Sequence, residues 1–498
     1  MTTADDRTRY RPHPSVLDAL TSPRLLTREV LAGLVVGLAL IPEAIAFSII
    51  AGVDPRVGLF SAFVMAVSIA FVGGRPAMIS AATGAVALVI APVMREHGMD
   101  YFIATVILAG VFQILLAVLG VAKLMRFIPR SVMTGFVNAL AILVFIAQLP
   151  QLIDVPWLVY PLVAGGILIM VAMPRITKVI PGPLVSIVLI TAVVVVFALD
   201  VPTVGDEGEL PRSLPELFIP NVPLTWETLT IIAPFSLGMA LVGLLESLMT
   251  AKLVDEITDT HSHKTREAWG QGVANMISGI FGGMGGCAMI GQTMINVKVS
   301  GARTRISTFC AGVFLLVLVV TLGDVVAMIP MAALVAVMIM VCVATFDWHS
   351  IRPSTLRRMP KSETIVMLST VVLVVITSNL AIGVVAGVAV ASVLFVRRVA
   401  HFTTVTRTVS TDAAHYVVDG ELFFASSNDL TTQFEYTGDP DRIVIDLSRS
   451  HIWDASSVAA LDAIRTKYAA QGKAVELVGL NEASGSFHGR LSGGFPLA

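Results

Sequence analysis

The chain has 498 residues, of which 55% are hydrophobic and only 14% are charged, and its mean hydropathy is +0.84. Soluble domains carry about 25% charged residues, so this composition excludes an ordinary soluble protein and indicates a polytopic α-helical membrane protein. The net charge of −2 gives no reason to expect nucleic acid as a partner, and no GxxxxGK[ST] loop for ATP hydrolysis occurs. Cys287, Cys310 and Cys342 have no metal-ligand spacing. We expect them to be small buried residues, and we expect neither a metal nor a cofactor nor enzymatic activity.

Fourteen apolar segments follow the polar residues 1–28. They cover residues 29–52, 56–73, 79–94, 101–122, 128–149, 157–173, 183–200, 229–253, 268–284, 288–299, 306–325, 328–346, 363–379 and 381–399. If all of them cross the bilayer from an inside N-terminus, 23 of the lysine and arginine residues before the tail fall inside and three fall outside. This bias follows the positive-inside rule. It predicts a multi-pass protein of the cytoplasmic (inner) membrane, surrounded by lipid, with both termini in the cytoplasm.

The apolar run from Ile231 to Leu253 contains one carboxylate near its middle, Glu246. An ionisable group at mid-membrane is costly, so it usually faces a cavity on an ion or substrate path. A second intramembrane carboxylate, Glu43, follows Pro42, which interrupts backbone hydrogen bonding and predicts a discontinuous first span. A permanently ionised Glu43 would repel an anion. It is therefore protonated, turned away from the substrate, or hydrogen-bonded to a freed backbone group.

Two apolar segments, 79–94 and 288–299, are too short to cross the bilayer as ordinary helices, and each follows a glycine-rich break, FVGGRPAM and FGGMGGCAM. Each is the third span of a seven-span half, which is typical of an inverted-repeat transporter with a site at the midplane. Half-helices that begin there direct unpaired N–H groups and a positive dipole end at the space between them, which attracts an anion. Alternatively, the glycines only permit close helix packing.

The polar tail after about residue 402 has a different pattern. Strand-like runs, HYVVDGELFF, RIVIDLSR and AVELVGL, alternate with the helix-like DASSVAALDAIRTKYAAQ. This alternation predicts a small α/β domain with some parallel strand pairing at residues 403–498, which the predicted topology places in the cytoplasm.

Three stretches resemble the sulfate permease (SulP) family of anion transporters. They are LAGLVVGLALIPEAIAFSIIAGVDPRVGLFSA, GQGVANMISGIFGGMGGCAMIGQTMINVKVSGARTR and, in the tail, RIVIDLSRSHIWDASSVAAL, which is similar to the STAS domain of that family. The resemblance implies 14 spans arranged as 7+7 inverted repeats at residues 29–402, with a core domain that moves against a gate domain. It also implies a homodimer, and a substrate held between the starts of spans three and ten.

The resemblance also assigns residues. It places the eighth-span carboxylate at Glu246, and at Thr250 the threonine that helps bind the ion in sodium-coupled bicarbonate members; residues i and i+4 share one helix face. Ile290 stands where those members have threonine, which favours proton coupling over sodium. The substrate-contacting residues that we expect are Glu43, Ser80, Ala81, Ala82, Ala288, Met289 and Ile290, and the ion-coupling residues are Glu246 and Thr250.

These observations predict a secondary active transporter of a small anion (bicarbonate, sulfate or a dicarboxylate) that works by alternating access and is proton-coupled through Glu246. A sodium-coupled bicarbonate symporter is the first alternative. A nucleobase permease shares the expected fold, but such proteins place a second carboxylate on span ten and lack the STAS tail. A membrane-anchored STAS signalling protein is the remaining alternative; the retained Glu246 and both half-helices argue against it.

Overall fold

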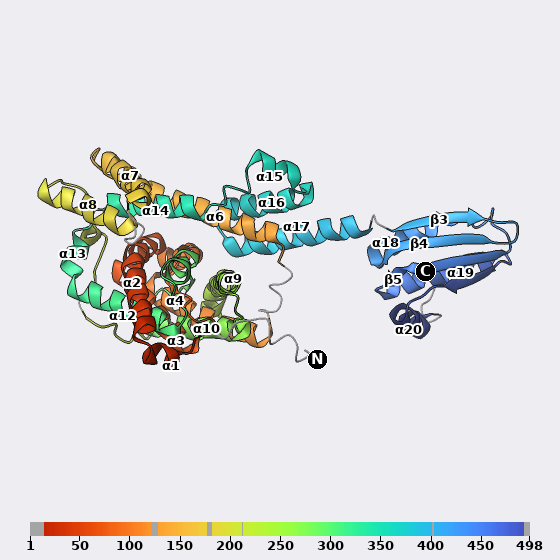
Figure 1. Ribbon diagram of the computed structural model, residues 1–498, viewed down its shortest axis with the longest axis horizontal. Coiled ribbons are helices and arrows are strands. Elements are labelled where there is room, and N and C mark those ends of the chain that lie inside the picture. The colour runs from red at the N-terminus through yellow and green to blue at the C-terminus, as the bar shows by residue number, and fades with distance from the viewer. Residues whose placement is uncertain (1–13, 121–127, 177–181, 212, 401–402, 493–498) are drawn as a thin grey trace. The chain divides into compact units, whose positions relative to one another are not determined.

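The computed structural model describes residues 14–120, 128–176, 182–211, 213–400 and 403–492. The chain divides into two compact units, Met1–Val388 and Ala389–Ala498. The first unit is built from helices, whereas the second contains a four-stranded sheet (Figure 1).

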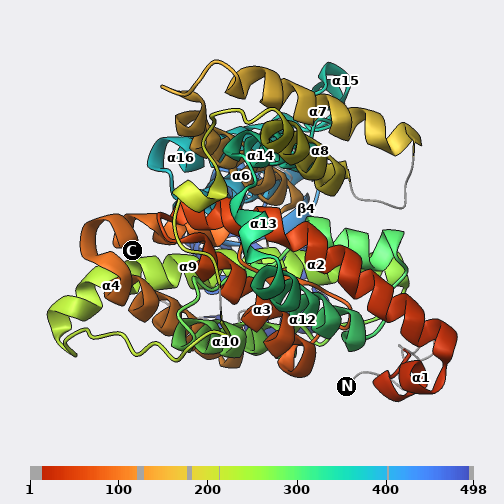
Figure 2. The same ribbon diagram turned by 90° about the vertical axis from the view of Figure 1, so that its left-hand side faces the viewer.

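The helices of the first unit lie in two layers, which are visible in both views (Figures 1 and 2). The first layer contains α1 (Val16–Thr21), α2 (Pro23–Ala51), α3 (Pro55–Val72), α4 (Gly84–Val118), α9 (Trp226–Thr258), α10 (Lys264–Ile280), α11 (Ile290–Met294), the π-helix η5 (Ile295–Val299) and α12 (Arg305–Thr321). The second layer contains α6 (Arg130–Gln148), α7 (Val159–Ile176), α8 (Gly182–Val196), α14 (Met331–Thr345), α15 (Pro353–Arg358) and α16 (Lys361–Thr377). Short helices η3 (Leu149–Leu152), η4 (Val204–Asp206) and α13 (Gly323–Ala327) lie in connections, and α17 (Leu380–Ala400) runs on into the second unit. Within the first layer α4 packs on α9 and α10; within the second, α6 packs on α16 and α14.

Length and composition suit these helices to a bilayer. Within the described ranges, six helical stretches are long and apolar enough to cross a membrane: α2, α3, α4, α9, Arg130–Leu152 and Leu380–Arg398. Four shorter apolar helices accompany them, namely Val159–Met173, Gly182–Val196, α12 and α14. This confirms a polytopic helical membrane protein, whereas the number of fourteen spans stays a prediction.

The first span is not discontinuous, so that prediction is wrong. Helix α2 continues through Pro42 and ends at Ala51, where Gly52 caps it in the left-handed conformation with φ 77°. Proline removes one N–H donor without ending the helix, and α2 packs closely on α12: a Cβ added at Gly33 would lie 2.6 Å from the Cβ of Cys310. The break expected between segments 79–94 and 101–122 falls at Gly98, whose φ of 81° kinks α4.

Close backbone contact joins α4 to α10. A Cβ at Gly110 would lie 2.6 Å from the carbonyl oxygen of Gly272, and a Cβ at Gly272 would lie 2.6 Å from that of Gly110. Any larger residue at either position would force the helices apart. Here glycine does serve helix packing.

The second unit contains the predicted α/β domain, after the C-terminal part of α17. Its strands are β3 (Thr404–Val409), β4 (Ala414–Leu422), β5 (Arg442–Ile452) and β6 (Ala474–Val478), and its helices are α18 (Phe424–Leu430), η6 (Thr431–Gln433), α19 (Ala455–Ala469) and α20 (Glu482–Leu491). The strand order is β3-β4-β5-β6; β3 and β4 are antiparallel, whereas β4–β5 and β5–β6 are parallel. The expected parallel pairing is therefore confirmed.

A polar cluster lies inside the core of this domain. The carboxylate of Asp439 accepts hydrogen bonds from the hydroxyl groups of Tyr416 and Tyr468, each at 2.6 Å, and from the guanidinium group of Arg407 at 2.6 Å. Burial by itself raises the pKa of Asp439, but these three donors outweigh burial and lower the pKa below its ordinary value. Burial and the bond to Asp439 raise the pKa of Tyr468 far above its ordinary value.

Candidate functional site

The two short apolar segments meet in the first layer through a short antiparallel pair of strands, β1 (Ser80–Ala81) and β2 (Cys287–Ala288). The amide of Met289 donates to the carbonyl oxygen of Ile79 at 2.9 Å. Only glycine fits beside this crossing, because a Cβ at Gly286 would lie 1.8 Å from the carbonyl oxygen of Ala81. The glycine-rich break before the second segment thus lets the two backbones touch.

A helix begins directly after each of these strands. In α4 the first intrahelical bond runs from Ala87 to the carbonyl oxygen of Thr83 at 2.9 Å, and in α11 it runs from Thr293 to that of Met289 at 3.1 Å. The amides before Ala87 and Thr293 lie in first turns, where no intrahelical acceptor exists. Both helices therefore begin with backbone donors and a positive dipole end next to the strand pair.

A cavity of about 590 Å³ opens beside these helix starts, and we call it the central cavity. From the first layer it is lined by Glu43, Phe47, Thr83, Gly84, Ala85, Glu246, Met289, Ile290, Gly291 and Gln292, among others. From the second layer it is lined by Phe136, Leu140, Val144, Met170, Val337, Met340 and further residues of the same helices. The two layers thus form its opposite walls, and among the described residues its lining includes no lysine, arginine or histidine.

Both intramembrane carboxylates face the central cavity, and each is only 8% exposed. Glu246 on α9 accepts a hydrogen bond at Oε2 from the thiol of Cys287, with Sγ at 3.0 Å. The same sulfur lies 3.1 Å from the hydroxyl oxygen of Thr83. Glu43 on α2 accepts a short hydrogen bond from the side-chain amide of Gln292 on α11. A neutral donor therefore connects each carboxylate to the second of the two crossing segments, Cys287 in β2 and Gln292 in α11.

The expected substrate residues divide into two sets. Glu43, Met289 and Ile290 line the central cavity, whereas Ser80, Ala81, Ala82 and Ala288 are buried and are not part of its lining. The second set is buried because these residues form or adjoin the strand pair, where the two segments pack against each other. Their polar groups are bonded there: Ser80 Oγ accepts a hydrogen bond from Gln271 at 2.6 Å, and the amide of Ala288 donates to Ser247 Oγ at 3.0 Å. The cavity lies one to three residues further along each segment.

Thr250 also lies outside the cavity lining. Its hydroxyl group donates to the backbone carbonyl oxygen of Glu246, one helical turn earlier, at 2.8 Å, and the residue is fully buried. The cation nearest the first segment in sequence, Arg75, is held elsewhere. Its guanidinium group binds Asp255 at 2.9 Å and Thr260 at 2.8 Å.

Cys287 provides a contact in the candidate site that sequence reasoning missed. A cysteine in an apolar segment is usually a small buried residue, and that was the expectation for this one. Cys287 is buried as expected, and its thiol also connects Thr83 to Glu246. The sequence feature that could have identified Cys287 was its position directly before Ala288, where the segment expected to bind the substrate begins.

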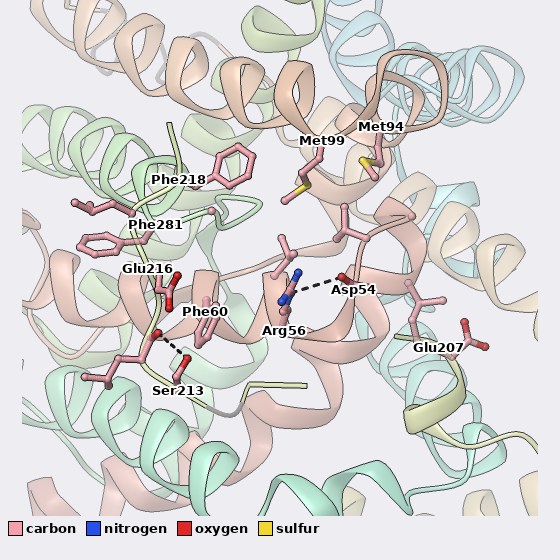
Figure 3. Close-up of a pocket in the computed structure, with 17 residues that line it drawn as sticks. Asp54, Arg56, Phe60, Met94, Met99, Glu207, Ser213, Glu216, Phe218 and Phe281 are labelled. Carbon is pink, nitrogen blue, oxygen red and sulfur yellow. Dashed lines mark hydrogen bonds and ion pairs between the residues drawn. The ribbon is translucent and has the colours of Figure 1, made fainter. Parts of the chain in front are cut away.

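A second cavity, of about 760 Å³, lies under the loop between α8 and α9 and is separate from the central cavity (Figure 3). Arg56 at the start of α3 binds Glu209 of that loop at 2.5 Å, and lies 3.6 Å from Asp54. Phe218 and Phe281 lie on one side of Arg56, and Glu207 lies on the other. Carboxylates pair with Arg56, which is the one cationic side chain among the described residues that line this cavity, and these contacts hold the loop in place.

Comparison with known proteins identifies the family of the chain. The model of the Sulfate permease family matches residues 26–163 and 155–370, and the STAS domain model matches residues 405–484. The chain is 52% identical over 461 residues to "Putative sulfate transporter YbaR" of Bacillus subtilis (strain 168), covering 93% of this chain and 96% of that protein. It is 27% identical over 498 residues to the "Bicarbonate transporter BicA" of Picosynechococcus sp., covering 89% and 86%.

Solved structures agree with these matches. The transmembrane domain of a cyanobacterial bicarbonate transporter, BicA, superposes with a TM-score of 0.64 at 25% identity, covering 73% of this chain and 98% of that one. The murine Slc26a9 anion transporter in the inward-facing state has the same fold, with a TM-score of 0.80 at 16% identity and coverage of 98% and 91%. Both the membrane unit and the tail are matched. The chain therefore belongs to the sulfate permease family, a family of transporters rather than enzymes, and carries the C-terminal STAS domain that its tail predicted.

Proposed function

We propose that this protein is a secondary active transporter of a small inorganic or carboxylate anion, which works by alternating access between the two helix layers. The observation that carries the proposal is the central cavity itself. Its opposite walls belong to different layers, and it contains two helix starts and two carboxylates. Backbone donors at helix starts can bind an anion without a cationic side chain. A movement of one layer against the other would then expose the bound anion to each side in turn.

The anion is proposed to bind beside Gly84, Ala85, Ile290, Gly291 and Gln292. These residues are the first of α4 and α11, and they line the cavity. Ala288 and Met289 were expected donors, but their amides are already bonded to Ser247 and Ile79. The name of YbaR makes sulfate the first anion to test, and the name of BicA makes bicarbonate the second. A dicarboxylate is the third.

We infer proton coupling through Glu246 in preference to sodium coupling. A sodium ion needs several oxygen ligands, but Thr250 is fully buried outside the cavity lining and Ile290 has a hydrocarbon side chain. The group that contacts Glu246 is a thiol, which donates a hydrogen bond to the carboxylate and is not an oxygen ligand for a cation. A carboxyl group with no cation cage around it can exchange a proton between the two sides of the membrane.

The assembly and location are proposed from the family resemblance and the charge distribution. We infer a homodimer in the cytoplasmic membrane, with both termini and the STAS domain in the cytoplasm. The boundaries that we propose are residue 29 for the start of the transport domain and residue 403 for the start of the STAS domain.

Uptake of radiolabelled sulfate, bicarbonate and a dicarboxylate into proteoliposomes tests the proposal. An inward proton gradient in sodium-free buffer should drive uptake of at least one of these anions. Glu246→Gln should abolish the response to the gradient while the anion still binds, whereas the matched control Glu256→Gln, an exposed carboxylate on the same helix, should behave as the native protein. A strict requirement for sodium would overturn proton coupling in favour of a sodium symporter. No uptake of any anion would overturn transport itself.

A further inference from the structure

Four glutamates of the first unit are buried, and their surroundings divide them into two pairs. Glu29 accepts hydrogen bonds from the amides of Arg303 and Thr304 and from the hydroxyl group of Thr304, at 2.7, 3.2 and 2.9 Å. Glu267 accepts from the amides of Gly74 and Arg75 and from Gln271, at 2.7, 2.9 and 2.8 Å. With three donors each and no contact with the central cavity, these two carboxylates hold the fold together.

Glu43 and Glu246 form the other pair. Each faces the central cavity, and each has one neutral donor, Gln292 or Cys287, in place of three. A carboxylate paired with a cation would leave an unpaired buried charge whenever it took up a proton. A carboxylate with a neutral donor avoids that cost, so both of these groups can change their charge during transport.

Apart from Glu246, no acidic or basic side chain of the described residues lines the central cavity with Glu43. Across the cavity, the titratable side chains are those of Glu246 on α9 and Cys342 on α14, and Cys287 lies behind Glu246. The acidic, basic and histidine residues of the helices packed on α2 do not line the central cavity; they are Asp18 on α1, Arg56 on α3, Arg95, Glu96, His97 and Asp100 beside the kink of α4, Lys298 on η5 and Arg305 on α12. Glu29 on α2 itself lies fourteen residues before Glu43, which is about 21 Å along a helix.

The position of Glu43 conflicts with an anion in the cavity. Its bond to Gln292 holds the carboxylate at the first turn of α11, where the anion is proposed to bind. Two negative charges in a mostly apolar cavity repel each other strongly because the dielectric constant is low. Glu43 is not turned away from the cavity, so it must be neutral when the anion is present.

We propose that Glu43 is a second proton-binding group of the transport cycle, so that two protons accompany each anion, one on Glu43 and one on Glu246. The inference rests on the proposed proton-coupled function. The charges then balance as follows: a divalent anion with two protons moves no net charge, and a monovalent anion with two protons moves one positive charge. In Glu43→Gln only the proton on Glu246 remains, so a divalent anion would carry one negative charge inward.

Sulfate equilibration in proteoliposomes with a clamped membrane potential tests this stoichiometry, with fumarate as a second divalent probe. At zero potential, a proton gradient of one pH unit should accumulate the probe about 100-fold in the native protein and about tenfold in Glu43→Gln. An inside-positive potential of about 59 mV should leave the native ratio unchanged and raise the ratio of the variant about tenfold. Glu256→Gln should match the native protein, and Glu43→Asp should restore the native ratios because it keeps a carboxyl group.

The outcomes separate the two proposals. If the native protein accumulates the probe only tenfold per pH unit and Glu43→Gln does the same, Glu43 carries no transported proton, while proton coupling through Glu246 stands. If the native protein does not respond to the proton gradient, the proposed coupling itself fails. Infrared pH titration of the purified protein decides the matter if neither probe is transported: the inference requires Glu43→Gln to lose one protonated carboxyl band that Glu256→Gln keeps, and it is overturned if the band remains.

Discussion

The thiol of Cys287 donates a hydrogen bond to the carboxylate of Glu246 across the contact between β2 and α9, with Sγ 3.0 Å from Oε2. The backbone of Cys287 is at the same time paired with Ala81 in the crossing of the two short segments. The proposed coupling group is thus connected directly to the proposed anion site. We therefore expect a change in the charge of Glu246 to act on the strand pair, and a movement of the strand pair to act on Glu246.

Replacing Cys287 should reveal this connection. Cys287→Ala removes the only donor that the described residues show for Glu246, and a hydrogen bond to a charged group contributes about 1.5 kcal/mol. We expect the initial rate of proton-driven uptake to fall about tenfold. Cys287→Ser keeps a donor at the same place and should retain most of the rate. Equal rates in the alanine and serine variants would show that the contact has no part in transport.

A bulky residue at Gly291 should close the central cavity. Gly291 lines the cavity, and a Cβ added there meets no atom within 4 Å, so the side chain of Gly291→Trp can enter the open space without displacing the protein. Uptake should fall below about a tenth of the native rate while thermal stability is kept, since no buried contact is lost. Gly438→Trp, at an equally open position in the STAS domain, is the matched control. Normal transport by folded Gly291→Trp would place the substrate path elsewhere.

Ala288→Phe should act differently, although Ala288 was an expected substrate contact. Its side chain is fully buried in a cluster with Met78 and Ala251. Overpacking a site of this kind costs about 1–3 kcal/mol. We expect a lower melting temperature and less folded protein, measured by fluorescence-detected size exclusion with heating. A stable Ala288→Phe that has lost only anion binding would instead support the original placement of the site.

The sequence alone predicted which parts meet but not their register. Glycine-rich breaks and short apolar runs identify the two segments that form β1 and β2, and a lone carboxylate identifies Glu246, because both patterns reflect the cost of polar groups in a membrane. The strand pairing of Ala81 with Cys287 depends on contacts between residues two hundred positions apart. Local patterns do not encode this pairing, so four of the seven expected contacts, Ser80, Ala81, Ala82 and Ala288, fell one to three residues before the cavity lining. The thiol of Cys287 was overlooked for the same reason, because its partner lies on another helix.

Asp439 should stabilise the STAS domain in a manner that depends on pH. The folded-state pKa is lowered, so the contribution of Asp439 is fully present above the ordinary pKa of about 3.9 and is lost as the pH falls through the lower folded value. Asp439→Asn removes the charge at every pH and should cost about 1–3 kcal/mol. Hydrogen exchange of the full-length protein at pH 7 should show faster exchange in β4 and α19, which hold Tyr416 and Tyr468. Unchanged protection would contradict a stabilising cluster.

Removing the tail from Thr403 to Ala498 should leave the anion site intact. The lining of the central cavity comes from residues between Glu43 and Thr345, all in the first unit, and the hydrophobic core of the STAS domain is a separate cluster. The affinity of the truncated protein for sulfate, measured by ligand-induced thermal stabilisation, should stay within about threefold of the native value, which is less than 1 kcal/mol. Expression, dimerisation and turnover are the properties that we expect to change.

Gly291→Trp in the same truncated protein controls for sulfate bound elsewhere, since it should abolish the stabilisation. A folded truncation that had lost sulfate binding, while the full-length protein kept it, would show that the tail shapes the cavity.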